Sequence, residues 1–265
     1  MGPEATRGSS MTFLEHLEEL RRRLLHVFAS LAVAFGICWA FSARLYDFLA
    51  RPVMDALPEG RTLAFTSLPD PFILYMKVAL LAGIFLASPY ILWQLWLFIS
   101  PGLYGHERRM AVPFLFFSTA LFVTGGAFGY YIAFPTACRF FLSVGQPFEP
   151  ILTVREYFRL EMQVLLAMGL VFELPVLIFF FTRLGIITPR FLWEKFSYAV
   201  LVIFIIAAVI TPPDFVSQMM IGLPMIILYL VGIGVAWLFN PRQRGEARPS
   251  SDDKTSHDSS EGSSS

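Results

Sequence analysis

The chain alternates between long apolar runs and short polar segments. Six runs predict membrane-spanning helices, because about 20 apolar residues in an α-helix cover the hydrocarbon core of a bilayer. They cover residues 24–43, 72–99, 111–135, 158–181, 196–210 and 215–239. The pattern therefore predicts an all-α integral membrane protein with six transmembrane helices, in one membrane domain over residues 11–240.

The predicted helices are uneven in length and composition. The fifth has 15 residues and would reach about 23 Å, against a hydrocarbon core of about 30 Å. The sixth begins with polar residues, so the two C-terminal spans are short. They either thin the bilayer locally or form an ordinary tight hairpin. Proline and glycine interrupt most spans, which predicts kinked helices in a concave arrangement.

Other segments are predicted to lie at or beyond the membrane surface. Residues 11–25 have apolar positions at helical spacing, which predicts an amphipathic interfacial helix leading into the first span. Residues 45–57 and 139–142 are expected to form further amphipathic or interfacial stretches. The polar segments 1–10 and 241–265 are predicted to be disordered.

Composition and charge distribution support a membrane protein with a defined orientation. The chain is 56% hydrophobic and 15% charged, whereas soluble domains have about 25% charged residues. Thirteen of the 20 lysines and arginines fall on one side of the predicted spans. The positive-inside rule then places both termini in the cytoplasm. The net charge of zero gives no reason to expect a nucleic-acid partner.

One acidic residue, Glu173, lies inside an apolar run. A carboxylate in the middle of a span costs about 2.5–3.5 kcal/mol on insertion scales and is seldom left facing lipid. We expect Glu173 to face a cavity, a partner helix or water, as a functional residue. The alternative is a neutral glutamate that is hydrogen-bonded inside a helix bundle.

Acidic residues also occur on the predicted cytoplasmic side. Glu18 and Glu19 precede three arginines at 21–23, and Glu107 lies in a short loop before two arginines at 108–109. Ion pairs between each of the first two acids and the arginine four positions later offer a simple structural explanation. An acid in a short cytoplasmic loop contributes nothing to orientation, which makes Glu107 less ordinary.

No enzyme motif is visible. The chain has no P-loop, no G-x-S-x-G, no H-E-x-x-H and no cysteine pair at metal spacing. The two cysteines, Cys38 and Cys138, are expected to be unpaired thiols. We therefore expect no catalytic residues, no bound metal and no cofactor.

Several motifs in a fixed order resemble the TatC family, the multispanning receptor subunit of the twin-arginine protein translocase. The resemblance covers about residues 12–240. The motifs are HLEELR at 16–21, FISPGLY at 98–104, HERR at 106–109, FELP at 172–175 and TPPD at 211–214.

The resemblance implies a receptor that binds the Arg-Arg signal peptides of folded proteins at the cytoplasmic face of a prokaryotic inner membrane. It implies export driven by the proton-motive force, with TatA- and TatB-type single-span partners in an oligomeric complex. Glu19 and Glu107 match the acids that bind the twin arginines. Glu18 is an extra acid beside the first of them, and Arg21 completes that motif, so either acid could contact the signal.

The resemblance also suggests that the face containing Glu173 meets the single-span partners. Gln218, near the outer end of the sixth span, is expected to form another partner contact, or else a simple helix cap. Structural or loop-shaping roles are expected for Pro52, Phe98, Pro175, Pro212, Pro213 and Asp214.

Two other functions are considered. A secondary transporter would use Glu173 as a proton or cation site and needs further polar groups within the spans. The nearest are Gln163, Thr124 and Ser118, and none is charged. An intramembrane enzyme would need a nucleophile and base or a metal set, which the sequence lacks.

Overall fold

All the named elements of the described residues are helices. The computed structural model describes residues 13–54, 63–99, 111–145, 153–210 and 215–238. The two terminal segments that the sequence predicts to be disordered lie outside these ranges. The helices are α1 (Phe13–Ala40), α2 (Ser42–Met54), α3 (Asp70–Ile99), α4 (Ala111–Phe128), the π-helical turn η3 (Gly129–Ala133), α5 (Phe134–Val144), α6 (Val154–Phe172), α7 (Leu174–Arg183), α8 (Pro189–Glu194), α9 (Phe196–Ile210) and α10 (Phe215–Leu238).

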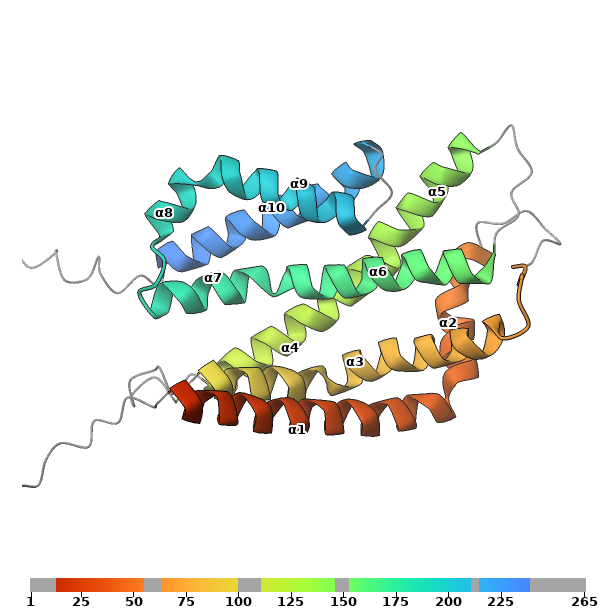
Figure 1. Ribbon diagram of the computed structural model, residues 1–265. Coiled ribbons are helices and arrows are strands. Elements are labelled where there is room, and N and C mark those ends of the chain that lie inside the picture. The colour runs from red at the N-terminus through yellow and green to blue at the C-terminus, as the bar shows by residue number, and fades with distance from the viewer. Residues whose placement is uncertain (1–12, 55–62, 100–110, 146–152, 211–214, 239–265) are drawn as a thin grey trace, which may run out of the picture.

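The helices are arranged around α6 and α7. Figure 1 shows α1 beside α3 along one edge, α9 beside α10 along the opposite edge, and α6 followed by α7 between them. The helix formed by α4, η3 and α5 runs obliquely across this arrangement. The first helix begins and the last helix ends at the same end of the molecule.

Five helical segments in the described part of the chain are long and apolar enough to cross a membrane. They are Leu17–Ala40, Asp70–Phe98, Val112–Val144, Val154–Arg183 and Phe215–Leu238. The remaining predicted span is the apolar helix α9, which has only 15 residues. The all-α membrane class is therefore confirmed, whereas the count of six spans stays a prediction.

Two predicted interfacial helices are parts of longer helices. No helix breaker separates residues 13–23 from the first apolar run, so α1 is continuous from Phe13 to Ala40. The third span continues past Pro135 through residues 139–142 to Val144. The N–H of Phe134 bonds to the carbonyl of Gly129, five residues earlier. This π turn directly precedes Pro135, which has no N–H to bond within the helix, and the helix continues beyond it.

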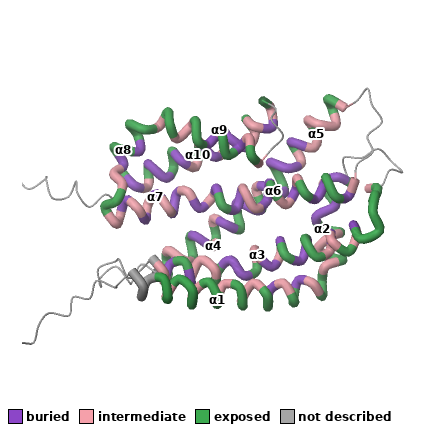
Figure 2. Tube along the Cα trace, in the orientation of Figure 1, coloured by how far each residue is buried: buried purple, intermediate pink, exposed green. Residues whose placement is uncertain are grey.

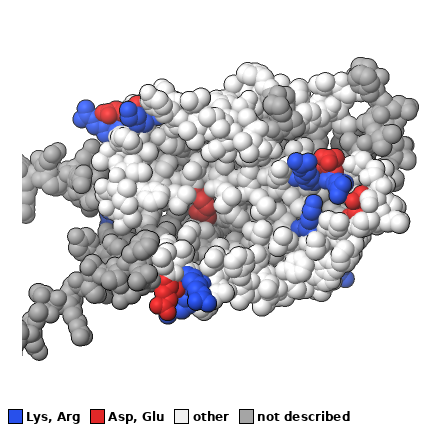
Figure 3. Space-filling model, viewed as in Figure 1, with Lys and Arg blue, Asp and Glu red and all other residues white. Residues whose placement is uncertain are grey.

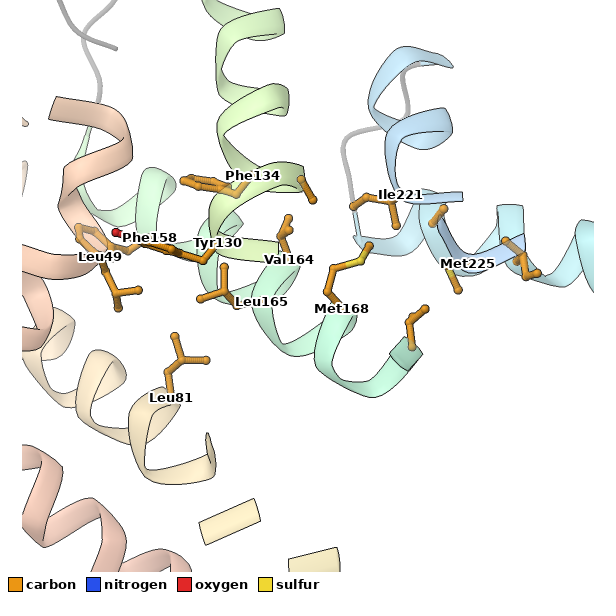
Figure 4. Packing of buried hydrophobic residues seen from close by; sticks show 14 of the residues in the cluster. Leu49, Leu81, Tyr130, Phe134, Phe158, Val164, Leu165, Met168, Ile221 and Met225 are labelled. Atoms are coloured by element: carbon orange, nitrogen blue, oxygen red, sulfur yellow. The ribbon is translucent and has the colours of Figure 1, made fainter. Parts of the chain in front are cut away.

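The core lies where α6 meets η3, α5 and α10. In Figure 4, side chains of α6 are packed between those of η3 and α5 on one side and those of α10 on the other. Gly125 lets α4 approach α6 closely, because a Cβ there would lie 2.4 Å from the carbonyl oxygen of Met168. The labelled core residues of these elements are Tyr130, Phe134, Phe158, Val164, Leu165, Met168, Ile221 and Met225.

Burial differs strongly between the spans (Figure 2). The most apolar window of Val154–Arg183 is 56% buried, whereas that of Leu17–Ala40 is 11% buried. The segment formed by α6 and α7 is therefore the most deeply buried span. Its two acidic residues within the apolar part, Glu161 and Glu173, are buried inside the protein.

Pro52 shapes the contact between α2 and the long third span. It lies inside α2 and lacks the N–H that would bond to the carbonyl of Phe48. The hydroxyl of Tyr130 donates to that carbonyl at 2.6 Å, and the Phe48 and Tyr130 rings stack with centroids 4.5 Å apart. These contacts support the structural role expected for Pro52.

Tyr130→Phe is expected to lower the free energy of unfolding in detergent by about 1 kcal/mol, because it removes this hydrogen bond and keeps the ring. Thermal or denaturant unfolding of the purified protein measures the change. The matched control is Tyr131→Phe, since Tyr131 is 67% exposed. Equal stability losses in the two variants would show that the hydroxyl of Tyr130 contributes nothing specific.

Candidate functional site

The first candidate site lies where α1 contacts the last turns of α3. Glu19 Oε1 accepts hydrogen bonds from Arg23 Nη2 at 2.6 Å and Nε at 3.2 Å. Arg23 Nη1 donates to Gln94 Oε1 on α3 at 3.2 Å. The predicted Glu19–Arg23 pair is therefore confirmed, and it is tied to a second helix. The Glu19 side chain is 11% exposed, so its carboxylate is held in a sheltered position.

One oxygen of this carboxylate has no hydrogen-bond partner among the described residues. Oε2 of Glu19 is buried and accepts no hydrogen bond from any residue that the structure describes. An ionised carboxylate can accept several donors, and leaving a buried acceptor unpaired is costly. Glu19 Oε2 is therefore an available acceptor beside a fixed ion pair.

The other expected residues of this site lie differently. Glu18 and Arg21 are exposed on α1, so neither shares the sheltered position of Glu19. Phe98 is half-buried in the last turn of α3. Glu107 lies in the segment 100–110, outside the described residues.

The second candidate site is centred on Glu173, at the break between α6 and α7. Ser118 Oγ on α4 donates to Glu173 Oε2 at 2.6 Å. Oε1 is buried without a hydrogen bond from any described residue. Pro175, in the first turn of α7, is buried and has no N–H to continue the hydrogen bonds of α6. The break therefore holds the carboxylate between helices, where it is hydrogen-bonded as in the alternative drawn from the sequence; its functional role stays a prediction.

Glu173 is buried, with only 6% of the residue's surface exposed. Thr119, next to Ser118, also has a buried hydroxyl without a partner among the described residues. The site thus combines one carboxylate, one bonded hydroxyl and unused hydrogen-bonding capacity in an apolar surrounding.

Gln218 belongs to a different contact. Its Nε2 donates to the carbonyl of Phe204 at 2.8 Å, which ties α10 to α9. Glu173 instead accepts a hydrogen bond from Ser118 of α4. The two polar side chains predicted for partner contacts therefore bond to different helices. The loop-shaping residues Pro212, Pro213 and Asp214 lie outside the described residues.

Sequence reasoning missed a second buried acid, Glu161 on α6. It is fully buried, and neither of its oxygens accepts a hydrogen bond from a described residue. Because Glu161 lies close to Arg159 and near the beginning of the predicted span, it was not distinguished from the polar residues at the membrane surface. Its spacing from Phe158, Leu165 and Met168 follows the apolar face of the helix, which is the signal that could have identified it.

The chain is similar to TatC proteins over most of its length. The family model for the Sec-independent protein translocase protein (TatC) matches residues 15–224. The TatC protein of Koribacter versatilis is 44% identical over 252 residues, covering 94% of this chain and 92% of that protein. The TatCy protein of Bacillus subtilis is 40% identical over 232 residues, covering 85% and 88% respectively.

A solved structure has the same fold. The crystal structure of a twin arginine translocase receptor, TatC, superposes on this chain with a TM-score of 0.77 and 34% identity, covering 84% of this chain and 99% of that one.

Proposed function

The chain belongs to the TatC family of Sec-independent protein translocase proteins, and from that premise we propose that it is the receptor that binds twin-arginine signal peptides at the cytoplasmic face. It is a transport protein of the prokaryotic inner membrane and a component of the translocase, with no enzymatic function assigned. The receptor would read the signal on a folded cargo protein before export driven by the proton-motive force.

The observation that carries the proposal is the unpaired oxygen of Glu19. The carboxylate is held by Arg23 and sheltered by α3, yet Oε2 accepts no hydrogen bond from the described residues. A guanidinium group of the signal peptide could donate to this oxygen. Glu18 is exposed one position away, so the geometry favours Glu19 as the residue that contacts the signal.

Arginine suits such a site better than lysine. The guanidinium group is planar and presents a fork of donors that matches a carboxylate, whereas the lysine ammonium is a point charge. A sheltered charge-assisted hydrogen bond contributes about 1.5–3 kcal/mol. With Glu107 as the second acid, two carboxylates on separate segments would read two adjacent arginines, and the modest affinity would allow release.

We propose that Glu173 takes part in partner recruitment. A TatA- or TatB-type single-span helix that carries a polar group could bond to the free oxygen of Glu173 within the bilayer. Such a bond contributes about 0.6–2 kcal/mol, enough to favour one docking register and weak enough to reverse. Gln218 would offer a second contact near the other end of the face.

The proposed topology has six spans with both termini in the cytoplasm. It is supported by the charge distribution and by the common end at which α1 begins and α10 ends (Figure 1). A shorter fifth span, α9, would be completed by flanking residues or by local thinning of the bilayer.

A secondary transporter remains less well supported than a receptor. It would need a second ionisable group close to Glu173, beyond the hydroxyl of Ser118, to form an ion pathway. Glu161 is the other buried acid of the same helix, but it lies twelve residues earlier, about 18 Å along the axis. The two carboxylates therefore do not form one site.

Binding of an Arg-Arg signal peptide to the purified protein in nanodiscs tests the proposal. We expect the peptide to bind, its Lys-Lys variant to bind at least about tenfold more weakly, and Glu107→Gln to weaken Arg-Arg binding while the protein stays folded. Equal binding of the two peptides would contradict the receptor function and favour a test of Glu173-dependent solute flux.

A further inference from the structure

Basic side chains surround a small recess between α3 and α6. Lys77, Arg155 and Arg159 line it together with one acid, Asp70. Figure 3 shows basic and acidic surface gathered at this end of the molecule, which is predicted to face outside. The lining of the recess therefore has three cations and one anion.

The acid is already engaged in local structure. Asp70 is the first residue of α3. Its Oδ2 accepts hydrogen bonds from the Ser67 N–H at 3.0 Å and from the Thr66 hydroxyl at 3.3 Å. Arg155 Nε lies 3.8 Å from Asp70 Oδ1. Asp70 therefore fixes the turn that precedes α3 and offsets one of the three cations.

The remaining cations are poorly compensated. Arg159 Nη1 lies 3.8 Å from Glu156 Oε2, but both side chains are more than 60% exposed, and such exposed pairs are weak. Lys77 makes no ion pair or hydrogen bond with a described residue. The cluster has a net positive charge and an unpaired ammonium group.

This charge lies within the apolar part of the helices. Lys77 is seven residues into the span Asp70–Phe98, about 10 Å along the axis from its beginning. Long basic side chains at such a depth extend towards the phosphate groups of the bilayer surface. The position of Lys77 therefore favours an anionic ligand at the level of the lipid headgroups.

An apolar groove begins beside the same cluster. It has a volume of about 450 Å³, whereas the basic recess holds only about 20 Å³, so a phosphate would lie across the mouth of the recess. Arg159 lines both. The apolar lining of the groove comes from α5, α6 and α9: Phe141, Leu160, Val209 and Ile210. Its polar lining consists of Arg159, Glu156 and Gln163 of α6.

We propose that this surface is a binding site for an anionic phospholipid, with its phosphate held by Lys77, Arg155 and Arg159 and one acyl chain in the adjoining groove. The combination of a cationic mouth with an apolar groove fits a phospholipid better than the acidic side chain of a partner protein, which would leave the groove empty. This inference does not depend on the proposed signal-peptide site, because the two lie at opposite ends of the helices.

Native mass spectrometry of the full chain in detergent, titrated with phosphatidylglycerol, tests the site. The variant Lys77→Gln with Arg159→Gln is expected to bind the first lipid about tenfold more weakly, since each basic residue near a membrane surface contributes to attraction of anionic lipid. The matched control is Arg44→Gln with Arg51→Gln. It removes the same charge from α2, where each arginine lies over a phenylalanine ring, and is expected to bind like the wild type.

The outcomes are distinguishable. Equal losses in the two double variants, or no loss in either, would overturn the proposal. Inorganic phosphate at millimolar concentration is expected not to displace the lipid; full displacement would mean that the site takes free phosphate and not a phospholipid. If the double variant does not fold, Lys77→Gln alone, compared with Lys77→Arg, provides the same test, and binding that is unchanged in Lys77→Gln would also overturn it.

Discussion

Replacing Glu19 with glutamine is expected to weaken binding of an Arg-Arg signal peptide by about tenfold to a hundredfold. The expectation follows from the loss of a proposed charge-assisted hydrogen bond of about 1.5–3 kcal/mol from the peptide to the unpaired Oε2 of Glu19. The side chain keeps its shape and one acceptor oxygen, so the helix should remain intact. Isothermal titration or fluorescence binding to the protein in nanodiscs measures the change, and the midpoint of thermal unfolding verifies the fold.

Glu18→Gln is the matched control. It makes the same change of charge one residue away, on a side chain that is exposed. An exposed pair contributes about 0–1 kcal/mol, so this variant should bind within about fivefold of the wild type. If Glu18→Gln and Glu19→Gln weakened binding equally, the effect would reflect the general charge of the N-terminal helix and not a site at Glu19.

Glu173→Gln is expected to reduce association with TatA- or TatB-type single-span partners by about threefold to thirtyfold, while signal-peptide binding changes little. The range corresponds to one intramembrane hydrogen bond of about 0.6–2 kcal/mol. Quantitative copurification of tagged partners measures the association. Peptide binding is measured in parallel, because Glu173 is bonded from α4, whereas Glu19 is tied through Arg23 to α3.

Two further variants separate a specific site from a general effect of buried acids. Ser118→Ala removes the donor that holds Glu173 Oε2 at 2.6 Å and should give a smaller loss of association than Glu173→Gln. Glu161→Gln changes the other buried acid of α6 and should leave partner association unchanged. A comparable loss in Glu161→Gln, or lost peptide binding in Glu173→Gln, would mean that Glu173 acts by shaping the receptor as a whole.

The hydrophobic pattern of the sequence was sufficient to predict the long helices and to place Glu173 within one of them. The apolar runs are long, and the energetic cost of a carboxylate in such a run does not depend on the details of the fold. Periodicity was weaker at the boundaries. Pro135 reads as the end of a span, yet the preceding π turn lets the helix continue to Val144. That turn depends on packing of Gly129 against α6, which no local pattern contains.

The sequence by itself determined that this is an all-helical membrane protein of the TatC family, because hydropathy and motif order are local properties of the chain. Only the tertiary structure decided which acidic side chains are sheltered from solvent. Glu19 contacts Arg23 and, through it, α3, whereas Glu18 is exposed; Glu161 is enclosed by helices that are distant from it in sequence. The physical reason is that burial and hydrogen-bond pairing depend on contacts between separate helices, whereas helical spacing only places a residue on a face.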